Sequence, residues 1–119
     1  MGDKEESTIL ESKFQKELID DIKAMFPGAI VLKNDPNYIQ GIPDLTVFYK
    51  DNWATLEVKK SANASHQPNQ DYYVGLMNEM SYSAFVYPEN KEEVLNGIQH
   101  AFRPKRKTCV SKRKQLSLD

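Results

Sequence analysis

The feature that most constrains this 119-residue chain is a pair of β-rich runs near its centre. The runs cover residues 44–49 and 53–59, and only Lys50, Asp51 and Asn52 separate them. A connection this short joins antiparallel strands, because parallel strands need a crossover of about a dozen residues or more. The sequence therefore predicts a central β-hairpin against which the other elements pack.

Helical and extended patterns surround this hairpin. Apolar residues at helical spacing between Leu10 and Phe26 predict an amphipathic helix over residues 7–26, ended by Pro27 and Gly28. Strands are expected at 29–32 and 83–87, a loop at 34–41, and helices at 69–80 and 91–102. The buried side of the 69–80 helix is expected to carry Tyr73, Leu76, Met77 and Met80, and the 91–102 helix to start with a capping box of Asn90 and Glu93. The order α, β, β, β, α, β, α predicts an α/β fold with one mixed sheet flanked by helices.

The hairpin also carries charged residues in a chemically useful pattern. Asp44 follows the rigid Pro43 at the start of the first strand, and Glu57 lies near the end of the second. The two carboxylates are therefore expected to face each other across the ladder. Strand alternation places Glu57 and Lys59 on one face.

This pattern is typical of a magnesium site. Two carboxylates, a backbone carbonyl such as that of Val58, and a substrate phosphate supply the oxygen ligands that Mg²⁺ prefers. Lys59 would orient a metal-bound water or help to deprotonate it, which indicates hydrolytic phosphoryl transfer. The competing interpretation makes Glu57 and Lys59 the solvated face of an exposed strand and Asp44 a strand-start residue.

The spacing resembles the signature of PD-(D/E)XK nucleases. Pro43-Asp44 is followed thirteen residues after the aspartate by Glu57-Val58-Lys59. The run 41–45 (Gly-Ile-Pro-Asp-Leu), the preceding helix and a later glutamine are similar to the viral-type replication and repair nuclease (VRR-NUC) branch and to related Holliday junction resolvases, over residues 7–80.

The resemblance implies a restriction-endonuclease-like α-β-β-β-α-β core and a Mg²⁺ or Mn²⁺ cofactor. It also implies DNA cleavage that leaves a 5′-phosphate, and a viral, phage or mobile-element role in replication, recombination or repair. Junction resolvases act as dimers on symmetric junctions, which suggests a homodimer.

Two supporting residues are assigned by the same resemblance. Glu11 corresponds to a first-helix acid that assists metal binding, although Thr8-x-x-Glu11 is also a capping box. Gln70 corresponds to a helix glutamine that orients the attacking water or the phosphate, and Gln67, one turn away, is an alternative. His66, a lone loop histidine, is expected to be solvated and is given no role.

Charge is distributed unevenly along the chain. Residues 103–119 carry a net charge of +6, whereas the rest of the chain carries −7. We expect one nuclease domain over residues 1–102 and a flexible basic tail over 103–119 that neutralises phosphates. The residues expected to bind nucleic acid are Lys60, Arg103, Lys105, Arg106, Lys107, Lys112, Arg113 and Lys114.

The remaining composition excludes several classes of protein. Cys109 is the single cysteine, so neither an intrachain disulfide nor a cysteine-based zinc site is expected. The chain shows no membrane-spanning run and no secretory signal, which predicts a cytoplasmic protein, in the host cytoplasm if it is viral.

Three functions fit the sequence. The first is a metal-dependent endonuclease specific for junctions or other branched DNA. The second is a non-catalytic nucleic-acid-binding protein that keeps the nuclease fold and binds through its basic tail. The third is an interaction module whose tail recruits a protein partner.

Overall fold

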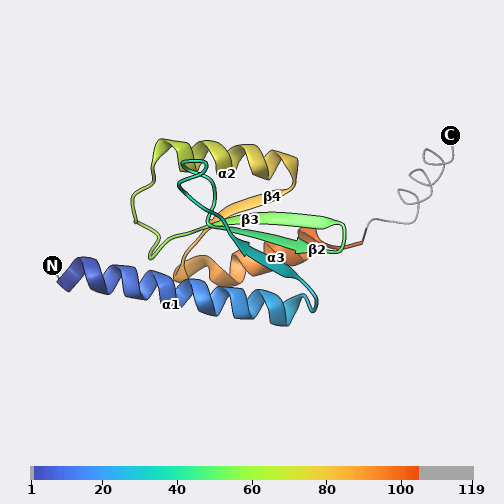
Figure 1. The fold of residues 1–119 in the computed structure, drawn as a ribbon. Helices are drawn as coiled ribbons and strands as arrows, with labels where there is room; N and C mark the ends of the chain where they lie inside the picture. Colours follow the sequence, from blue (N-terminus) through green and yellow to red (C-terminus); the bar gives the residue numbers. More distant parts are fainter. Residues whose placement is uncertain (1, 105–119) are drawn as a thin grey trace.

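A computed structural model describes residues 2–104 of the chain, including the side chains from residue 10 onward (Figure 1). Its elements are α1 (Gly2–Met25), β1 (Ile30–Lys33), β2 (Leu45–Tyr49), β3 (Asn52–Val58), α2 (Pro68–Met80), β4 (Tyr82–Val86), the 3₁₀ turn η1 (Pro88–Asn90) and α3 (Lys91–Ala101). The order of helices and strands confirms the sequence prediction, and most strand ends differ from the expected ones by one residue.

The four strands form one mixed sheet in the order β1-β2-β3-β4. The first three are antiparallel neighbours, as expected for the hairpin, and β4 lies parallel to β3. Tyr49 pairs with Asn52, so the hairpin turn contains two residues and not the three expected. Lys50 in this turn has φ 57°, in the left-handed region that tight hairpin turns require. The parallel pairing of β3 and β4 needs a crossover, which α2 provides.

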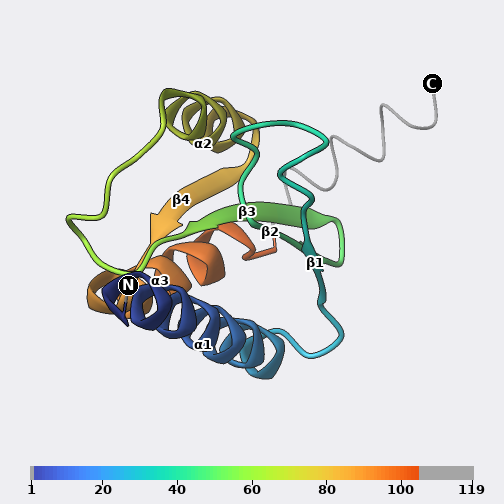
Figure 2. The same cartoon turned by 60° about the vertical axis from the view of Figure 1, so that its left-hand side comes forward.

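Helices cover both faces of the sheet (Figure 2). On one face, α1 and α3 pack against the strands and enclose the apolar core, which includes Leu18, Ile22, Leu45, Val47, Leu56, Val86 and Ile98. On the other face, α2 packs against β3 and β4, where Thr55 donates a hydrogen bond to the Met77 sulfur. Residues that alternate with the core positions of β2 and β3 therefore point to the α2 side.

The spacing of apolar residues explains why α1 packs as it does. Phe14, Leu18 and Ile22 recur every four residues and are buried, so they form one stripe against the sheet. Gly28, at φ +93°, ends the helix, and the Ala29 N–H donates to the Phe26 carbonyl at 2.9 Å. Within the described residues, no helix is both long enough and apolar enough to cross a membrane.

Three expectations about the helices are wrong. Helix α1 begins at Gly2 and not at residue 7, and its first turns extend past the sheet (Figure 1), so Leu10 is 61% exposed. Met80 is exposed because α2 ends there, and the buried residue of this helix is Val74. Asn90 occupies the N-cap position of α3 as expected, but its side chain makes no capping hydrogen bond there, because its amide oxygen accepts from the Tyr87 N–H and its amide nitrogen donates to the Phe85 carbonyl, which closes η1 instead.

Candidate functional site

The two predicted carboxylates meet where β2 begins and β3 ends. Leu45 pairs with Leu56, so the same register extended by one residue sets Asp44 opposite Glu57. The Val58 N–H donates to Asp44 Oδ2 at 2.9 Å, and the Asp44 carbonyl accepts from the Asn34 N–H at 2.8 Å. Asp44 is therefore fixed through both its side chain and its backbone.

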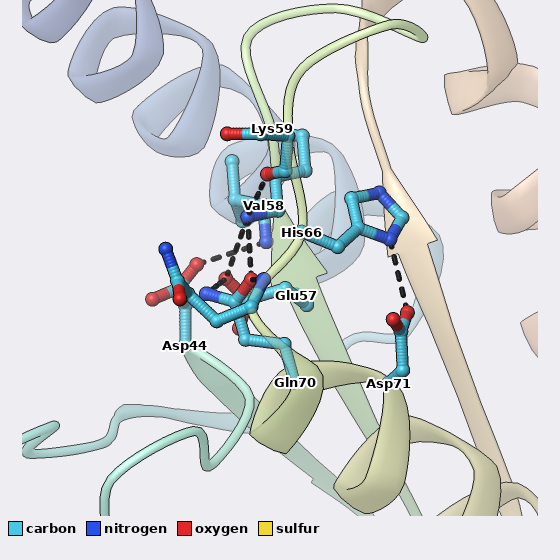
Figure 3. A network of polar contacts seen from close by, with 9 residues as sticks. Asp44, Glu57, Val58, Lys59, His66, Gln70 and Asp71 are labelled. Atoms are coloured by element: carbon cyan, nitrogen blue, oxygen red, sulfur yellow. Dashed lines mark hydrogen bonds and ion pairs between the residues drawn. The ribbon is translucent and has the colours of Figure 1, made fainter.

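Lys59 and Gln70 complete a network around Glu57 (Figure 3). Lys59 Nζ donates to Gln70 Oε1 at 2.7 Å and lies 3.8 Å from Glu57 Oε2. Gln70 Nε2 donates to the same Glu57 oxygen at 3.0 Å. One amide thus links the acidic residue to the basic one and orients both.

This geometry distinguishes the two candidate glutamines. Gln70 contacts Glu57 and Lys59 directly, whereas Gln67 is exposed at the start of α2. The Gln67 N–H donates to Gln70 Oε1 at 2.9 Å, so the first turn of α2 helps to hold Gln70. Gln70 is therefore the glutamine of this site.

Burial excludes the interpretation of these charges as a solvated strand face. Glu57 is 4% exposed and Lys59 is 9% exposed, on a central strand covered by helices on both sides. Burying charged groups costs free energy unless they are paired, and here the Gln70 amide and the ion pair between Glu57 and Lys59 offset that cost.

Burial also changes the protonation of the carboxylates. It raises the pKa of Glu57 to about 8, with the nearby Asp44 carboxylate as the second cause and the Lys59 ammonium opposing both. Burial likewise raises the pKa of Asp44, although the Val58 N–H and Lys59 oppose this effect. The metal-free pair therefore retains a proton near neutral pH, as expected when two carboxylates share one desolvated site.

The two carboxylates fit a hard cation such as Mg²⁺. A divalent ion bound between them would replace the shared proton and neutralise their negative charge. Asp44 and Glu57 supply carboxylate oxygens, and the N–H of Val58, the residue whose carbonyl was expected as a ligand, contacts Asp44. Among the described residues there is no group of three or more His, Cys, Asp and Glu side chains close enough to hold a metal ion. Further ligands would come from a backbone carbonyl, from water or from substrate, and the Glu11 carboxylate is near enough to Asp44 for burial and this neighbour to raise its pKa.

Glu11 lies at the edge of this site. Burial raises its pKa, and the Asp44 carboxylate raises it further, whereas Lys59 and Lys60 lower it. Thr8 lies inside α1, several residues after the helix start, so the capping-box interpretation of Glu11 is wrong. A role in metal binding stays a prediction.

The residues expected to bind nucleic acid lie in different places. Lys60 is exposed directly after Lys59, beside the site. Arg103 is exposed just after Phe102, whose ring lies 6.3 Å from that of Tyr49 at the turn end of the hairpin. The hairpin therefore separates Arg103 from the carboxylates. The other predicted contacts, Lys105, Arg106, Lys107, Lys112, Arg113 and Lys114, lie outside the described residues.

His66 is exposed, as the sequence predicted, but it also makes two contacts that no sequence pattern indicated. Its ring stacks on Phe85 of β4, with centroids 3.9 Å apart, and its Nδ1 lies 3.0 Å from Asp71 Oδ1. Figure 3 shows the imidazole directed away from the carboxylate pair. The residues on either side are nevertheless part of the network, because the Ser65 carbonyl accepts from Lys59 Nζ at 3.1 Å and the Gln67 N–H donates to Gln70. His66 therefore anchors the loop that holds Lys59 and Gln70.

A glycine holds the loop before Asp44 against the start of α2. Gly41 has φ +91°, and a Cβ added there would lie 2.3 Å from the Cβ of Asn69. The chain that leads to Asp44 and the helix that carries Gln70 are thus in direct contact. Gly28 has a nearly identical φ of +93° but no neighbouring atom within 4 Å of an added Cβ.

We expect Gly41→Ala to reduce the free energy of unfolding by roughly 2–3 kcal/mol, against about 1 kcal/mol for Gly28→Ala. Both substitutions strain the backbone at positive φ, but only the first also creates a clash with Asn69. Urea unfolding of the two variants measures the difference. Equal losses would show that the contact between Gly41 and Asn69 is not tight.

Comparisons of this chain with protein-family models, with curated proteins and with solved structures find no match.

Proposed function

We propose that this protein is a metal-dependent endonuclease of the PD-(D/E)XK type that hydrolyses DNA phosphodiester bonds. The observation that carries the proposal is the buried Glu57 opposite the partly buried Asp44, with Gln70 linking Glu57 to Lys59 at the end of the central hairpin. The order α-β-β-β-α-β and the mixed sheet support a restriction-endonuclease-like core.

Each residue of the site has a distinct role in this proposal. Asp44, Glu57 and the Val58 carbonyl would hold Mg²⁺ or Mn²⁺, with Glu11 assisting from α1. When bound, such an ion polarises the phosphate and lowers the pKa of a coordinated water. Lys59 orients the attacking water and stabilises negative charge that develops on the phosphate. Gln70 holds the Lys59 and Glu57 side chains in position, because it is hydrogen-bonded to both.

The substrate follows from the same proposal. A domain without a recognisable base-reading module selects DNA by shape more readily than by sequence, which fits a junction, a flap or another branched DNA. The motif's resemblance to VRR-NUC proteins and junction resolvases suggests a homodimer, and a viral or mobile-element role in recombination, repair or replication.

Cleavage of labelled DNA tests the proposal. Wild type should cut at least one of four-way-junction, flap, duplex and single-stranded DNA in Mg²⁺ or Mn²⁺, and EDTA should stop the reaction. Asp44→Asn should abolish cutting, whereas Asp20→Asn, at an exposed position on α1, should not change it. If folded wild type cuts none of these substrates with either metal, the protein is not a nuclease of this type.

A non-catalytic nucleic-acid-binding protein is the second candidate. The position of Arg103 favours it, because the basic segment starts at the turn end of the hairpin and can contact phosphates independently of the carboxylates. Deletion of residues 105–119 separates the two functions. A binding protein should lose its salt-sensitive affinity, whereas a nuclease should still cut at high enzyme concentration.

His66→Ala is expected to lower kcat by up to about 10²-fold, because small displacements of groups around a reacting centre have effects of this size. The substitution removes the contacts with Phe85 and Asp71 that hold the loop under Lys59. Ser65→Ala is the matched control, because Ser65 contacts Lys59 through its carbonyl, which alanine keeps. Single-turnover cleavage measures both variants, and equal rates would contradict the anchoring role.

A further inference from the structure

A hollow of about 430 Å³ lies on the α2 side of the sheet, between the loop 34–42 and α2. Figure 2 shows this loop rising from β1 toward α2. The residues that line the hollow are Asn34, Asp35, Tyr38, Ile39, Ile42, Thr46 and Met77. Its volume is within the range of small-molecule sites, about 300–1,000 Å³, and is sufficient for one nucleobase.

The hollow adjoins the carboxylate pair. Thr46 lies two residues after Asp44 and on the same face of the sheet, so their Cα atoms are about 7 Å apart. Asn34 links the hollow to the segment that carries Asp44. Its amide nitrogen donates to the Pro43 carbonyl at 2.9 Å and to Thr46 Oγ1 at 2.8 Å. A nucleotide whose phosphate lies at Asp44 can therefore place its base, or that of its neighbour, in the hollow.

The lining suits a base and not a phosphate. Ile39, Ile42 and Met77 supply apolar surface, and the Tyr38 side chain, 84% exposed, stands at the rim where a base can stack on it. The lining contains no lysine or arginine, and the carboxylate of Asp35 would repel a phosphate. The Asn34 amide oxygen and the Asp35 carboxylate are hydrogen-bond acceptors, which match the amino and imino groups of bases.

We propose that this hollow binds an unpaired nucleobase of the DNA strand whose phosphate lies at Asp44 and Glu57. The inference rests on the proposed nuclease function and specifies its substrate. A base in a closed duplex is stacked and paired, and it must leave the helix before it can enter such a pocket. Flaps, junction branch points and single strands present unpaired bases at no such cost, so the pocket selects these substrates over closed duplex DNA.

Binding measurements test the pocket without relying on catalysis. The probe is a fluorescein-labelled flap DNA in Ca²⁺, with fluorescence anisotropy as the readout, and with single abasic sites placed in turn across the branch point. For wild type, one or two abasic positions should weaken binding about tenfold, whereas the other positions should have no effect. Closed duplex DNA should show no sensitive position.

Two tyrosine variants assign the effect to this pocket. Tyr38→Ala should weaken binding of the intact flap about tenfold, and it should show no further loss at the sensitive abasic positions, because base and ring contact each other. Tyr72→Ala is the matched control, since Tyr72 is also exposed but lies on α2 outside the hollow. Full additivity of Tyr38→Ala and the abasic sites, or equal effects of the two tyrosine variants, would overturn the inference.

The outcome is independent of the proposed catalysis. If the protein binds in this pattern but cuts no DNA, the pocket inference stands and the nuclease proposal is wrong. If the protein cuts DNA but binding has no sensitive abasic position, the nuclease proposal stands and the pocket inference is wrong.

Discussion

Replacing Glu57 with glutamine is expected to reduce metal-dependent cleavage by about 10³-fold or more, because it removes one of the two carboxylates proposed to hold the ion. The same substitution should make the stability of the metal-free protein less dependent on pH. The amide has nearly the shape of the carboxyl group and carries no charge at any pH, so the fold is expected to be retained.

The pH effect follows from the raised pKa of Glu57. Burial and the Asp44 carboxylate raise this pKa from its ordinary value of 4.5 to about 8. Between these two values the unfolded chain carries an ionised Glu57, whereas the folded protein keeps the proton. The stabilising contribution is therefore complete below about pH 4.5 and is lost as the pH rises to about 8.

Urea unfolding of metal-free protein from about pH 5 to about pH 9 measures this effect. The free energy of unfolding of wild type should fall across the range, and Glu57→Gln should show a smaller fall, with Asp44 contributing the remainder. Glu79→Gln, at an exposed position on α2, is the matched control and should follow wild type. Identical pH profiles for wild type and Glu57→Gln would show that Glu57 is ionised in the folded protein.

Replacing Lys59 with methionine is expected to lower kcat by about 10²–10⁴-fold, the range observed when a group that transfers or orients a proton is removed. Methionine fills much of the same buried space without the ammonium group that now contacts Gln70 and the Ser65 carbonyl. Mg²⁺ affinity should be unchanged or higher, because the cation beside the two carboxylates is gone. Single-turnover cleavage together with calorimetric titration of Mg²⁺ separates the two effects.

Lys60→Met is the control for this variant. Lys60 is the exposed neighbour of Lys59 and is expected to contact a phosphate. Its loss should raise KM and reduce the salt dependence of binding by about one phosphate contact, with little change in kcat. If the two variants lowered kcat equally, Lys59 would have no special role in the reaction.

The sequence was sufficient to predict the hairpin and the residues that meet on it. Strand alternation and a short connection place Asp44, Glu57 and Lys59 on one face at one end, and both features are local. The same alternation fitted a solvated strand equally well. Glu57 and Lys59 are buried because α2 and β4 pack around β3, and such long-range contacts leave no local sequence pattern.

Other features depended on single contacts that a sequence does not show. Gln70 enters the site and Gln67 does not, because α2 begins at Pro68. Gln67 is therefore the N-cap residue, whereas Gln70 lies in the first turn and donates to Glu57. His66 stacks on the ring of Phe85, nineteen residues later in the chain, and no local pattern indicates such a contact. Asn90 and Glu93 were predicted to start α3, and Asn90 is at its N-cap position, but the Asn90 side chain hydrogen-bonds to the turn before α3 and not to the helix itself.

The parallel pairing of β3 with β4 has a consequence for how the protein folds. Asp44 and Glu57 come together through the hairpin, whose strands are neighbours in sequence and can pair early. Lys59 is held from the other side, where its N–H donates to the Val86 carbonyl at 2.8 Å and its ammonium contacts Gln70 on the crossover helix. Contacts between distant segments form slowly, so we expect the acidic half of the site to assemble first and its lysine to be fixed last.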